Sequence, residues 1–411
     1  MSLPSINATA KQATGTQRAV APMLYTVYFV YFFCGMTQCF EGVFLPEFKT
    51  YFGLDYQQQM YTMFAKNIPF LFAGAIGILL SRTGYRRSFV LALLLFAAGT
   101  TLLVPGLAVR QYAIVLSGFL LIGFGFNFEM VAGNPLLSAL GAPETASSRL
   151  NFANALGAVA QIIAPLTLAW IIPASAITVA SRVPWMKALF AVLAIALLMT
   201  ALFVARIHAP AVQRGADCKN SELSKAQLPP RVYYGLAAIT LSLGAEAALF
   251  GFYRNYLEDP SVGALASSAS QRLFTVYFAV FALGRLLASW AQKRIAPSTH
   301  LLLNLATAVV FIGTAIVAHG TVAIIVMTAM GFWVASFYPT LYSLATRGLG
   351  DLEAKASGLL TMGFLGAALF PVLQGRIADR FGLSNSYVAT LIAYALIGIL
   401  VLRLRRSAAH L

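Results

Sequence analysis

Long apolar runs separated by short polar segments make up most of this chain of 411 residues. Each run is about 20 residues long, which is the length that an α-helix needs to cross the hydrocarbon core of a bilayer. Backbone groups in lipid must be hydrogen-bonded within their own segment, and the alternating pattern of a membrane β-barrel is absent. The pattern therefore predicts an all-α membrane protein with twelve transmembrane helices, near residues 24–45, 60–80, 88–107, 112–133, 151–173, 185–206, 232–253, 270–291, 299–318, 321–342, 355–375 and 386–404.

One long polar segment, residues 207–231, interrupts the series after the sixth run. We therefore expect a cytoplasmic N-terminal tail at 1–23, a six-helix bundle at 24–206, a cytoplasmic linker at 207–231, and a second six-helix bundle with a short tail at 232–411. A plan of six plus six helices is typical of transporters built from repeats. In such proteins the substrate binds between the two halves, near the middle of the membrane.

Composition and charge agree with a membrane protein and argue against other classes. Hydrophobic residues make up 59% of the chain and charged residues only 10%, which is too little polar surface for a soluble domain of this size. The net charge of +15 does not indicate a nucleic-acid partner, because the Lys and Arg residues fall between the apolar runs. Most of them face the cytoplasm if both termini are cytoplasmic, as the positive-inside rule requires. We expect a multi-pass protein of the bacterial inner membrane.

Motifs for catalysis or for metal and nucleotide binding are missing from the sequence. We find no HExxH pattern, no phosphate-binding glycine loop followed by Lys-Ser/Thr and no paired histidines, and the three cysteines fit neither a disulfide framework nor a zinc site. We therefore expect no enzyme activity, no cofactor and no metal. The expected partners are a small-molecule substrate, protons and the lipid bilayer, and the chain is expected to be a monomer.

Five charged residues stand out because they lie inside the predicted helices, where a charge costs a few kcal/mol. They are Glu41, Lys66, Glu129, Glu246 and Arg285. A carboxyl group in a cavity of low dielectric constant can take up and release a proton near neutral pH. Glu129 or Glu41 is therefore a candidate for proton coupling.

The two intramembrane cations allow more than one interpretation. Lys66 either pairs with one of the acids or binds an anionic group of the substrate, and Arg285 is best explained as a structural charge. The alternative for the whole set is that buried ion pairs merely fix helix packing. Two bases do not neutralise three acids, so at least one acid is expected to be protonated or to contact a ligand.

Polar, aromatic and small residues in the same runs complete the candidate site. Besides Lys66, the side chains that we expect to bind substrate are Tyr31, Asn127, Asn151, Asn154, Glu246 and Tyr338. Small residues at Gly74, Gly77, Gly358, Gly363 and Gly366 allow close approach of neighbouring helices. Tyr338-Pro339 puts a helix breaker beside a polar side chain, where it either opens the backbone to a cavity or ends a helix.

Two stretches of the sequence resemble a known superfamily. The segment Gly77-Ile-Leu-Leu-Ser81-Arg82-Thr-Gly84-Tyr-Arg86-Arg87 is similar to the loop motif of the major facilitator superfamily, with Ser81 in place of the acid. The segment Glu129-Met-Val-Ala-Gly-Asn134-Pro135, followed by Arg149-Leu150-Asn151, resembles the fucose–proton symporter family. The resemblance implies the major facilitator fold, alternating access and proton-coupled symport.

Only some of the functional residues of that family are present at the matching positions of this chain. The family's glutamate in the fourth helix falls on Glu129, whereas its aspartate in the first helix falls on Gly42, one place after Glu41. An asparagine expected in the fifth helix falls on Gly157, and a glutamine expected at 246 is a glutamate.

These departures leave the substrate open. Lys66 and Glu246 add charges that a neutral sugar does not need, which suggests a charged substrate. One hypothesis is proton-coupled uptake of a sugar-like or carboxylate-bearing metabolite. The alternative is export of a small anionic metabolite or siderophore by proton antiport.

Overall fold

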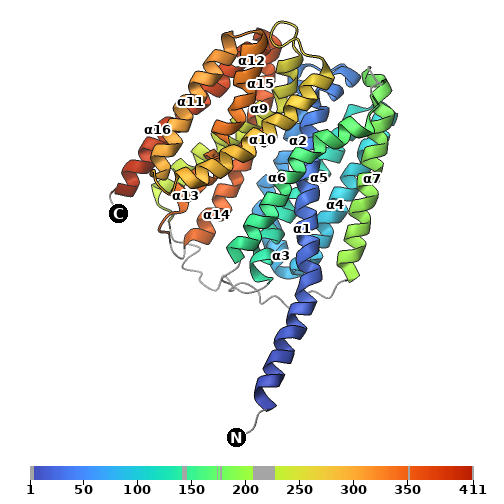
Figure 1. Cartoon of the computed structure of the whole chain (residues 1–411), viewed down its shortest axis with the longest axis vertical. Coiled ribbons are helices and arrows are strands. Elements are labelled where there is room, and N and C mark those ends of the chain that lie inside the picture. Colours follow the sequence, from blue (N-terminus) through green and yellow to red (C-terminus); the bar gives the residue numbers. More distant parts are fainter. Residues whose placement is uncertain are drawn as a thin grey trace.

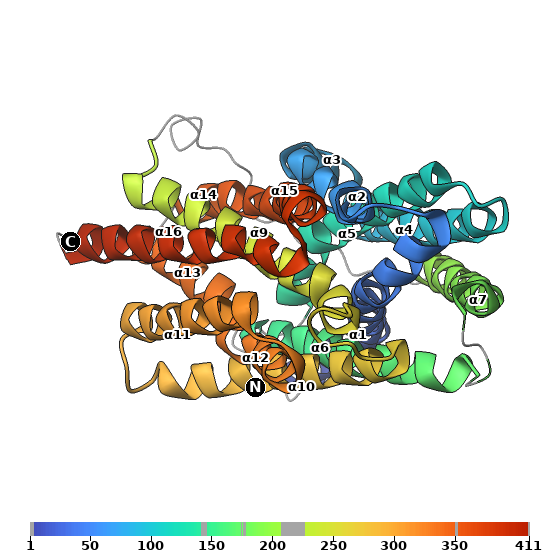
Figure 2. The ribbon, with the colours of Figure 1, turned by 90° about the horizontal axis from the view of Figure 1, so that it is seen from above.

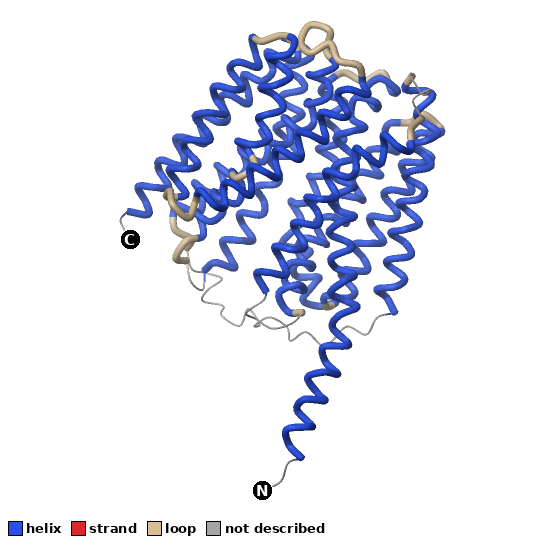
Figure 3. Tube along the Cα trace, in the orientation of Figure 1, coloured by secondary structure: helices blue, strands red, loops and turns tan. Residues whose placement is uncertain are grey.

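The structure is a computed structural model in which residues 4–140, 146–173, 175, 178–206, 227–349 and 352–409 are described. These residues form helices joined by short turns, with no strand in the described ranges (Figure 3). Eleven of the helices are long and apolar enough to cross a membrane, and a shorter apolar stretch, Phe152–Leu168, lies within a further helix. The prediction of an all-α protein with two six-helix bundles is confirmed.

The first half of the chain folds into six membrane spans. They are α1 (Pro4–Phe52), α2 with η1 and α3 (Tyr56–Asn67, Ile68–Phe72 and Ala73–Thr83), α4 (Tyr85–Ala108), α5 (Tyr112–Ala139), α6 (Ala146–Ile171) and α7 (Val179–Arg206). The N-terminal part of α1 projects from the bundle as a helix (Figure 1). The linker at 207–226 lies outside the described residues.

The second half repeats this plan. Its spans are α9 (Pro230–Glu258), α10 (Ser267–Ala291), α11 (Pro297–Val317), α12 with α13 (Gly320–Val334 and Phe337–Thr346), α14 with η4 and α15 (Glu353–Thr361, Met362–Phe364 and Leu365–Phe381) and α16 (Leu383–Ala409). Seen from above, the two halves lie side by side (Figure 2). They meet where α2 contacts α15 and where α6 contacts α10.

Two names are used below for the ends of the bundle. The tail side is the end from which the N-terminal part of α1 projects, and it also holds the end of α7 and the start of α9. The far side is the opposite end, where α1 turns into α2 and α9 turns into α10.

The first helix is longer than the apolar pattern predicted. It continues beyond residue 45 to Phe52 and includes Pro46. Aromatic packing explains the extension, because Phe48 contacts the ring of Phe119 and Phe52 contacts the ring of Tyr112. The helix therefore remains buried past the point where the sequence turns polar.

Three spans are interrupted near the middle of the bundle. Span 2 changes to a 3₁₀ turn at Ile68–Phe72, which contains Pro69, and span 11 does the same at Met362–Phe364. The two turns meet, since the rings of Phe70 and Phe364 stack with their centroids 4.5 Å apart. Span 10 breaks between α12 and α13, directly before Tyr338-Pro339. Broken helices at this depth are typical of transporter binding sites, where irregular backbone faces a cavity.

The five glycines expected to allow close helix packing differ in how near their neighbours lie. A Cβ added to Gly366 would lie 1.8 Å from the carbonyl oxygen of Thr240, so α15 approaches α9 closely there, and Gly363 is similarly crowded by Ile239. An added Cβ at Gly74, Gly77 or Gly358 would meet no atom within 4 Å. The expected close approach therefore occurs at Gly363 and Gly366, but α3 and the glycine of α14 face open space in this conformation.

Candidate functional site

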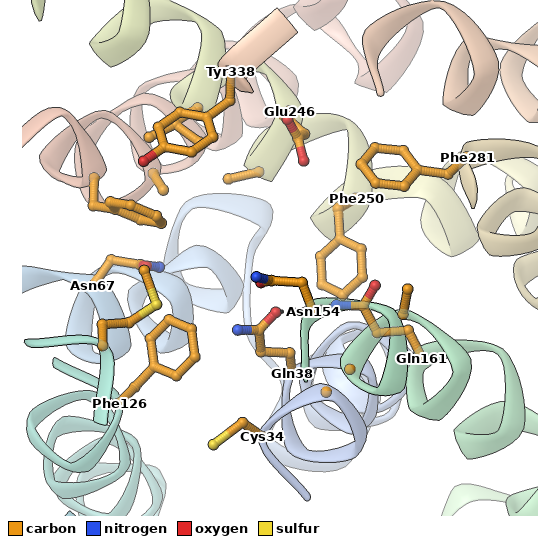
Figure 4. A pocket seen from close by; sticks show the side chains of 18 of the residues that line it. Cys34, Gln38, Asn67, Phe126, Asn154, Gln161, Glu246, Phe250, Phe281 and Tyr338 are labelled. Atoms are coloured by element: carbon orange, nitrogen blue, oxygen red, sulfur yellow. Dashed lines mark hydrogen bonds between the residues drawn. The ribbon is translucent and has the colours of Figure 1, made fainter. Parts of the chain in front are cut away.

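A cavity of about 300 Å³ lies between the two halves, near the middle of the bundle (Figure 4). The first half contributes residues of α1, α2, α5 and α6 to its wall, and the second half contributes residues of α9, α10, α13, η4 and α15. Such a volume suits a small polar molecule. Both halves would contact a molecule bound there.

Amide side chains from the first half form one part of the wall. Gln38 on α1 and Gln161 on α6 are linked by a hydrogen bond in which Gln161 Nε2 donates to Gln38 Oε1 at 3.2 Å. Asn154 extends from α6 beside them and is exposed to the cavity (Figure 4). This arrangement depends on close contact of α1 and α6, because a Cβ on Gly35 would lie 2.2 Å from the carbonyl oxygen of Gly157.

Aromatic side chains dominate another part of the wall. Phe250, Phe281 and Tyr338 come from the second half and line the cavity, and the Phe250 ring reaches the first half beside Gln161 (Figure 4). Tyr338 also contacts the ring of Phe364, with centroids 5.9 Å apart. A ligand in the cavity would therefore meet both flat apolar rings and hydrogen-bonding amides.

Glu129 lies on α5 at the cavity wall and is 1% exposed. Its carboxyl group shares a hydrogen bond with the hydroxyl of Tyr31 from α1. Among the described residues, no partner hydrogen-bonds to its Oε1 atom. A buried carboxylate oxygen without a partner is costly, so this carboxyl group is suited to carrying a proton or contacting a ligand.

Lys66 and Glu41 form a buried ion pair between neighbouring helices. Lys66 Nζ donates a hydrogen bond to Glu41 Oε2, and the Lys66 side chain is 12% exposed whereas that of Glu41 is fully buried. Lys66 lines the cavity, but Glu41 lies behind it and is not part of the wall. The pairing with an acid that the sequence allowed for Lys66 is present.

Glu246 and Arg285 lie at the wall of the second half and interact electrostatically. Arg285 also donates from Nε to the carbonyl oxygen of Ala335 at 3.2 Å, and its guanidinium lies 4.6 Å from the ring centre of Phe281. The carbonyl of Ala335 belongs to the break between α12 and α13. Arg285 thus supports the irregular backbone and also faces the cavity.

The structure brings most of the predicted site residues together. Seven of them line the same cavity, namely Tyr31, Lys66, Glu129, Asn154, Glu246, Arg285 and Tyr338. Asn127 does not, because it is fully buried and its Nδ2 donates to the carbonyl oxygen of Pro69 at 2.6 Å, where it supports the 3₁₀ turn. The side chain of Asn151 lies outside the described part of the structure.

Sequence reasoning missed three amides that line the cavity, Gln38, Asn67 and Gln161. Each lies inside an apolar run, as Asn127 and Asn154 do, and the run by itself does not show which amides face a cavity. An uncharged amide inside such a run is the signal that would have found them, since it too needs a polar partner when it is removed from water. Among the residues that the structure describes, no cluster of three His, Cys, Asp or Glu side chains could hold a metal ion.

Hydrogen bonds join the two halves between the cavity and the far side. The backbone N–H groups of Tyr56 and Gln57, at the start of α2, donate to the carboxylate of Asp379 on α15 at 2.7 and 2.9 Å. Gln59 Nε2 donates to Asn255 Oδ1 on α9 at 2.8 Å. These bonds hold α2 of the first half against α15 and α9 of the second half on the far side.

Curated sequences similar to this chain are named as sugar carriers. A protein of Brucella abortus biovar 1 (strain 9-941) named "Glucose/galactose transporter" is 28% identical over 388 residues, which cover 93% of this chain and 94% of that protein. A "Putative glucose/galactose transporter" of Helicobacter pylori (strain ATCC 700392 / 26695) is 26% identical, with 87% and 89% covered. The "L-fucose-proton symporter" of Escherichia coli (strain K12) is 23% identical, with 86% of each chain covered.

Solved structures show the same fold. The fucose–proton symporter FucP in its outward conformation superposes with a TM-score of 0.67 at 21% identity, covering 94% of this chain and 99% of that chain. A bacterial homologue of the lysosomal transporter Spinster, inward-facing and occupied, gives a TM-score of 0.75 at 15% identity, with 94% and 97% covered. The family model described as "Major Facilitator Superfamily" matches residues 27–364, which is most of the chain. The chain therefore belongs to the Major Facilitator Superfamily and is a membrane transporter, not an enzyme.

Proposed function

We propose that this transporter carries a neutral hexose across the bacterial inner membrane by alternating access, in symport with protons. The observation that carries the proposal is the wall of the cavity, where the hydrogen-bonded amides of Gln38 and Gln161 line the same space as the rings of Phe250 and Phe281. Amides both donate and accept hydrogen bonds, as sugar hydroxyls require. Aromatic rings pack well against the apolar C–H face of a pyranose ring.

The charges at the cavity also favour a neutral substrate. Lys66 is paired with Glu41, and Arg285 has the carboxyl group of Glu246 nearby, so the protein itself supplies an acid for each cation. The curated relatives named for glucose, galactose and fucose agree with this interpretation, because all three are uncharged sugars. The extra charges that suggested a charged substrate are thus explained by partners within the protein.

Orientation follows from the distribution of basic residues. If the tail side is cytoplasmic, both termini and the basic linker face the cytoplasm, in agreement with the positive-inside rule. The far side, where hydrogen bonds join the halves, then faces outward, whereas on α3 and α14 an added Cβ at Gly74, Gly77 or Gly358 would meet no atom within 4 Å. We therefore assign this conformation to the inward-facing state.

Glu129 is the best candidate for carrying the coupled proton. Of the three acids predicted to matter, Glu41 has Lys66 and Glu246 has Arg285 nearby, but no cation among the described residues forms an ion pair with Glu129. A carboxyl group that is buried without a counter-ion favours its protonated form, whereas opening of the site to water favours the charged form. Alternating access would then bind and release a proton with each cycle.

A proteoliposome assay tests the proposal. Purified protein is reconstituted, an inward proton gradient is imposed, and uptake of labelled glucose, galactose and fucose is followed. We expect at least one of these hexoses to accumulate, with competition by other neutral hexoses and little by glucuronate. If no hexose moves under either direction of the gradient, a neutral sugar is not the substrate.

The alternative is export of a small anionic metabolite by proton antiport. It is favoured by one observation, namely that Arg285 is an exposed residue that lines the cavity. The same vesicles distinguish the two functions. Anion movement that is driven opposite to the proton gradient, with no hexose movement, would support export.

A further inference from the structure

We infer that four charged side chains on the far side form the outer gate of this transporter. We call Glu47, Arg182, Arg254 and Glu258 the far-side lock. The inference rests on the alternating access proposed above, but it concerns residues outside the cavity. It states that these residues hold the inward-facing state closed toward the outside and separate when the protein opens outward.

Arg254 on α9 is the centre of the lock. Its side chain is 1% exposed, and its Nη2 donates to Glu258 Oε1 at 2.7 Å and to Ser267 Oγ at 2.6 Å within the second half. Its Nη1 donates across the interface to the backbone carbonyl of Val43 on α1. A guanidinium buried this deeply needs every one of these acceptors, so it ties α1 to α9 and α10.

Glu47 on α1 completes the link from the first half. Its Oε1 accepts from Arg182 Nη1 of α7 at 2.7 Å and lies 3.4 Å from Arg254 Nη2 across the interface. Arg182 in turn donates to Ser267 Oγ of the second half at 3.0 Å. The Glu47 carboxylate and the Ser267 hydroxyl therefore each contact both Arg182 of the first half and Arg254 of the second half.

The composition of the lock suits a contact that must form and break. It contains two cations and two anions, so it carries no net charge while the halves are closed. Separation of the halves would expose these groups to water on the far side, and hydration would replace most of the lost bonds. A transporter must alternate between its inward-facing and outward-facing states, so the two states must differ little in free energy. Rigid-body movement of two bundles is a common way to interconvert such states.

Arg182 and Glu47 have open space beside them, whereas Arg254 does not. Glu47, Arg182 and Ser267 line a second cavity of about 420 Å³ on the far side, between α1, α6, α7 and α10. Arg254 does not line this cavity, and its side chain is almost completely buried. We expect the bonds of Arg182 to break first as the halves separate, because this side chain has open space to move into.

Accessibility of Cys34 tests the gate without a transport assay. Cys34 and Cys39 are both buried in this conformation, but Cys34 lines the central cavity and Cys39 does not. Right-side-out membrane vesicles are treated from outside with a membrane-impermeant maleimide, and labelling of Cys34 is followed over time. A Cys34→Ala variant supplies the background signal.

Three variants are compared with the wild type. Glu47→Gln removes the charge that joins the two cations, and Ser267→Ala removes only hydrogen bonds of the lock. Arg376→Gln is the matched control, because Arg376 is an exposed cation in the far-side half of α15 that lines neither the central cavity nor the far-side cavity. We expect outside labelling at least about fivefold faster in Glu47→Gln, a smaller increase in Ser267→Ala and no change in Arg376→Gln.

Labelling of Glu47→Gln and Ser267→Ala at the wild-type rate would overturn the inference. If Glu47→Gln does not reach the membrane, Ser267→Ala decides alone, since it preserves every charge. The readout does not depend on the identity of the substrate. A wrong assignment of the sugar would therefore leave the labelling result intact, and a wrong assignment of the gate would leave hexose transport intact.

Discussion

Lys66 Nζ donates a hydrogen bond to the Glu41 carboxylate, which joins α2 to α1 directly behind the wall of the central cavity. This pair explains how two opposite charges are tolerated in the membrane-spanning part of the protein. Lys66 also lines the cavity, and the carboxylate of Glu41 offsets part of its positive charge there. The pair is therefore the first place where the site can be tested by mutation.

Removal of Lys66 alone should destabilise the protein more than removal of both partners. Lys66→Ala leaves the fully buried Glu41 carboxylate without its partner, which we expect to cost about 3 kcal/mol of unfolding free energy. The double variant Lys66→Met with Glu41→Gln should regain most of this loss. Thermal unfolding in detergent measures both, and equal melting temperatures for the single and double variants would show that the pair is not coupled.

Replacement of Glu129 should separate transport from proton coupling. Glu129→Gln keeps the size of the side chain but cannot release a proton, so we expect loss of accumulation driven by a pH gradient while exchange of hexose across the vesicle membrane persists. Glu246→Gln is the comparison, because Glu246 lines the cavity with a cation, Arg285, nearby, and its replacement should affect binding rather than coupling. Active accumulation by Glu129→Gln would assign the proton to another group.

Loss of one amide from the cavity should weaken hexose binding without weakening the fold. Gln161→Ala removes the donor to Gln38 and one group available to sugar hydroxyls, and we expect KM to rise about tenfold. Gln111→Ala is a suitable control, because Gln111 is exposed before α5 and its side chain makes no capping bond. An unchanged KM for Gln161→Ala would place the sugar elsewhere.

Bulky residues at the open glycines should trap the inward-facing state. Gly77→Leu and Gly358→Leu add side chains where no atom lies within 4 Å, so the present conformation should fold normally. Closure of the tail side would then be blocked, and hexose transport should fall to background while the melting temperature stays within a few degrees. Transport at the wild-type rate would indicate that these positions face lipid in both states.

A crowded glycine provides the contrast for this experiment. At Gly366 an added Cβ would meet the backbone of Thr240 at 1.8 Å, and backbone cannot move aside cheaply. Gly366→Leu should therefore reduce the yield of folded protein, which Gly77→Leu should not. The two variants distinguish a packing defect from a block of conformational change.

The sequence by itself determined the architecture and the position of the charges along it. Twelve apolar runs and the polar segment at 207–231 predict the fold because the length of a membrane span is a local property of the chain. The same pattern placed Glu129, Lys66 and Glu246 at membrane depth, and the loop motif from Gly77 to Arg87 indicated the superfamily, which the match over residues 27–364 confirmed.

Only the tertiary structure decided which of these groups share a space and which are engaged elsewhere. It pairs Lys66 with Glu41 and turns Asn127 toward the carbonyl of Pro69, and it brings Gln38 and Gln161 together in the cavity wall. These outcomes depend on how each helix is rotated and on how closely helices approach at positions such as Gly35. Rotation and approach are set by contacts between residues far apart in the chain, which the periodicity of a single apolar run does not encode.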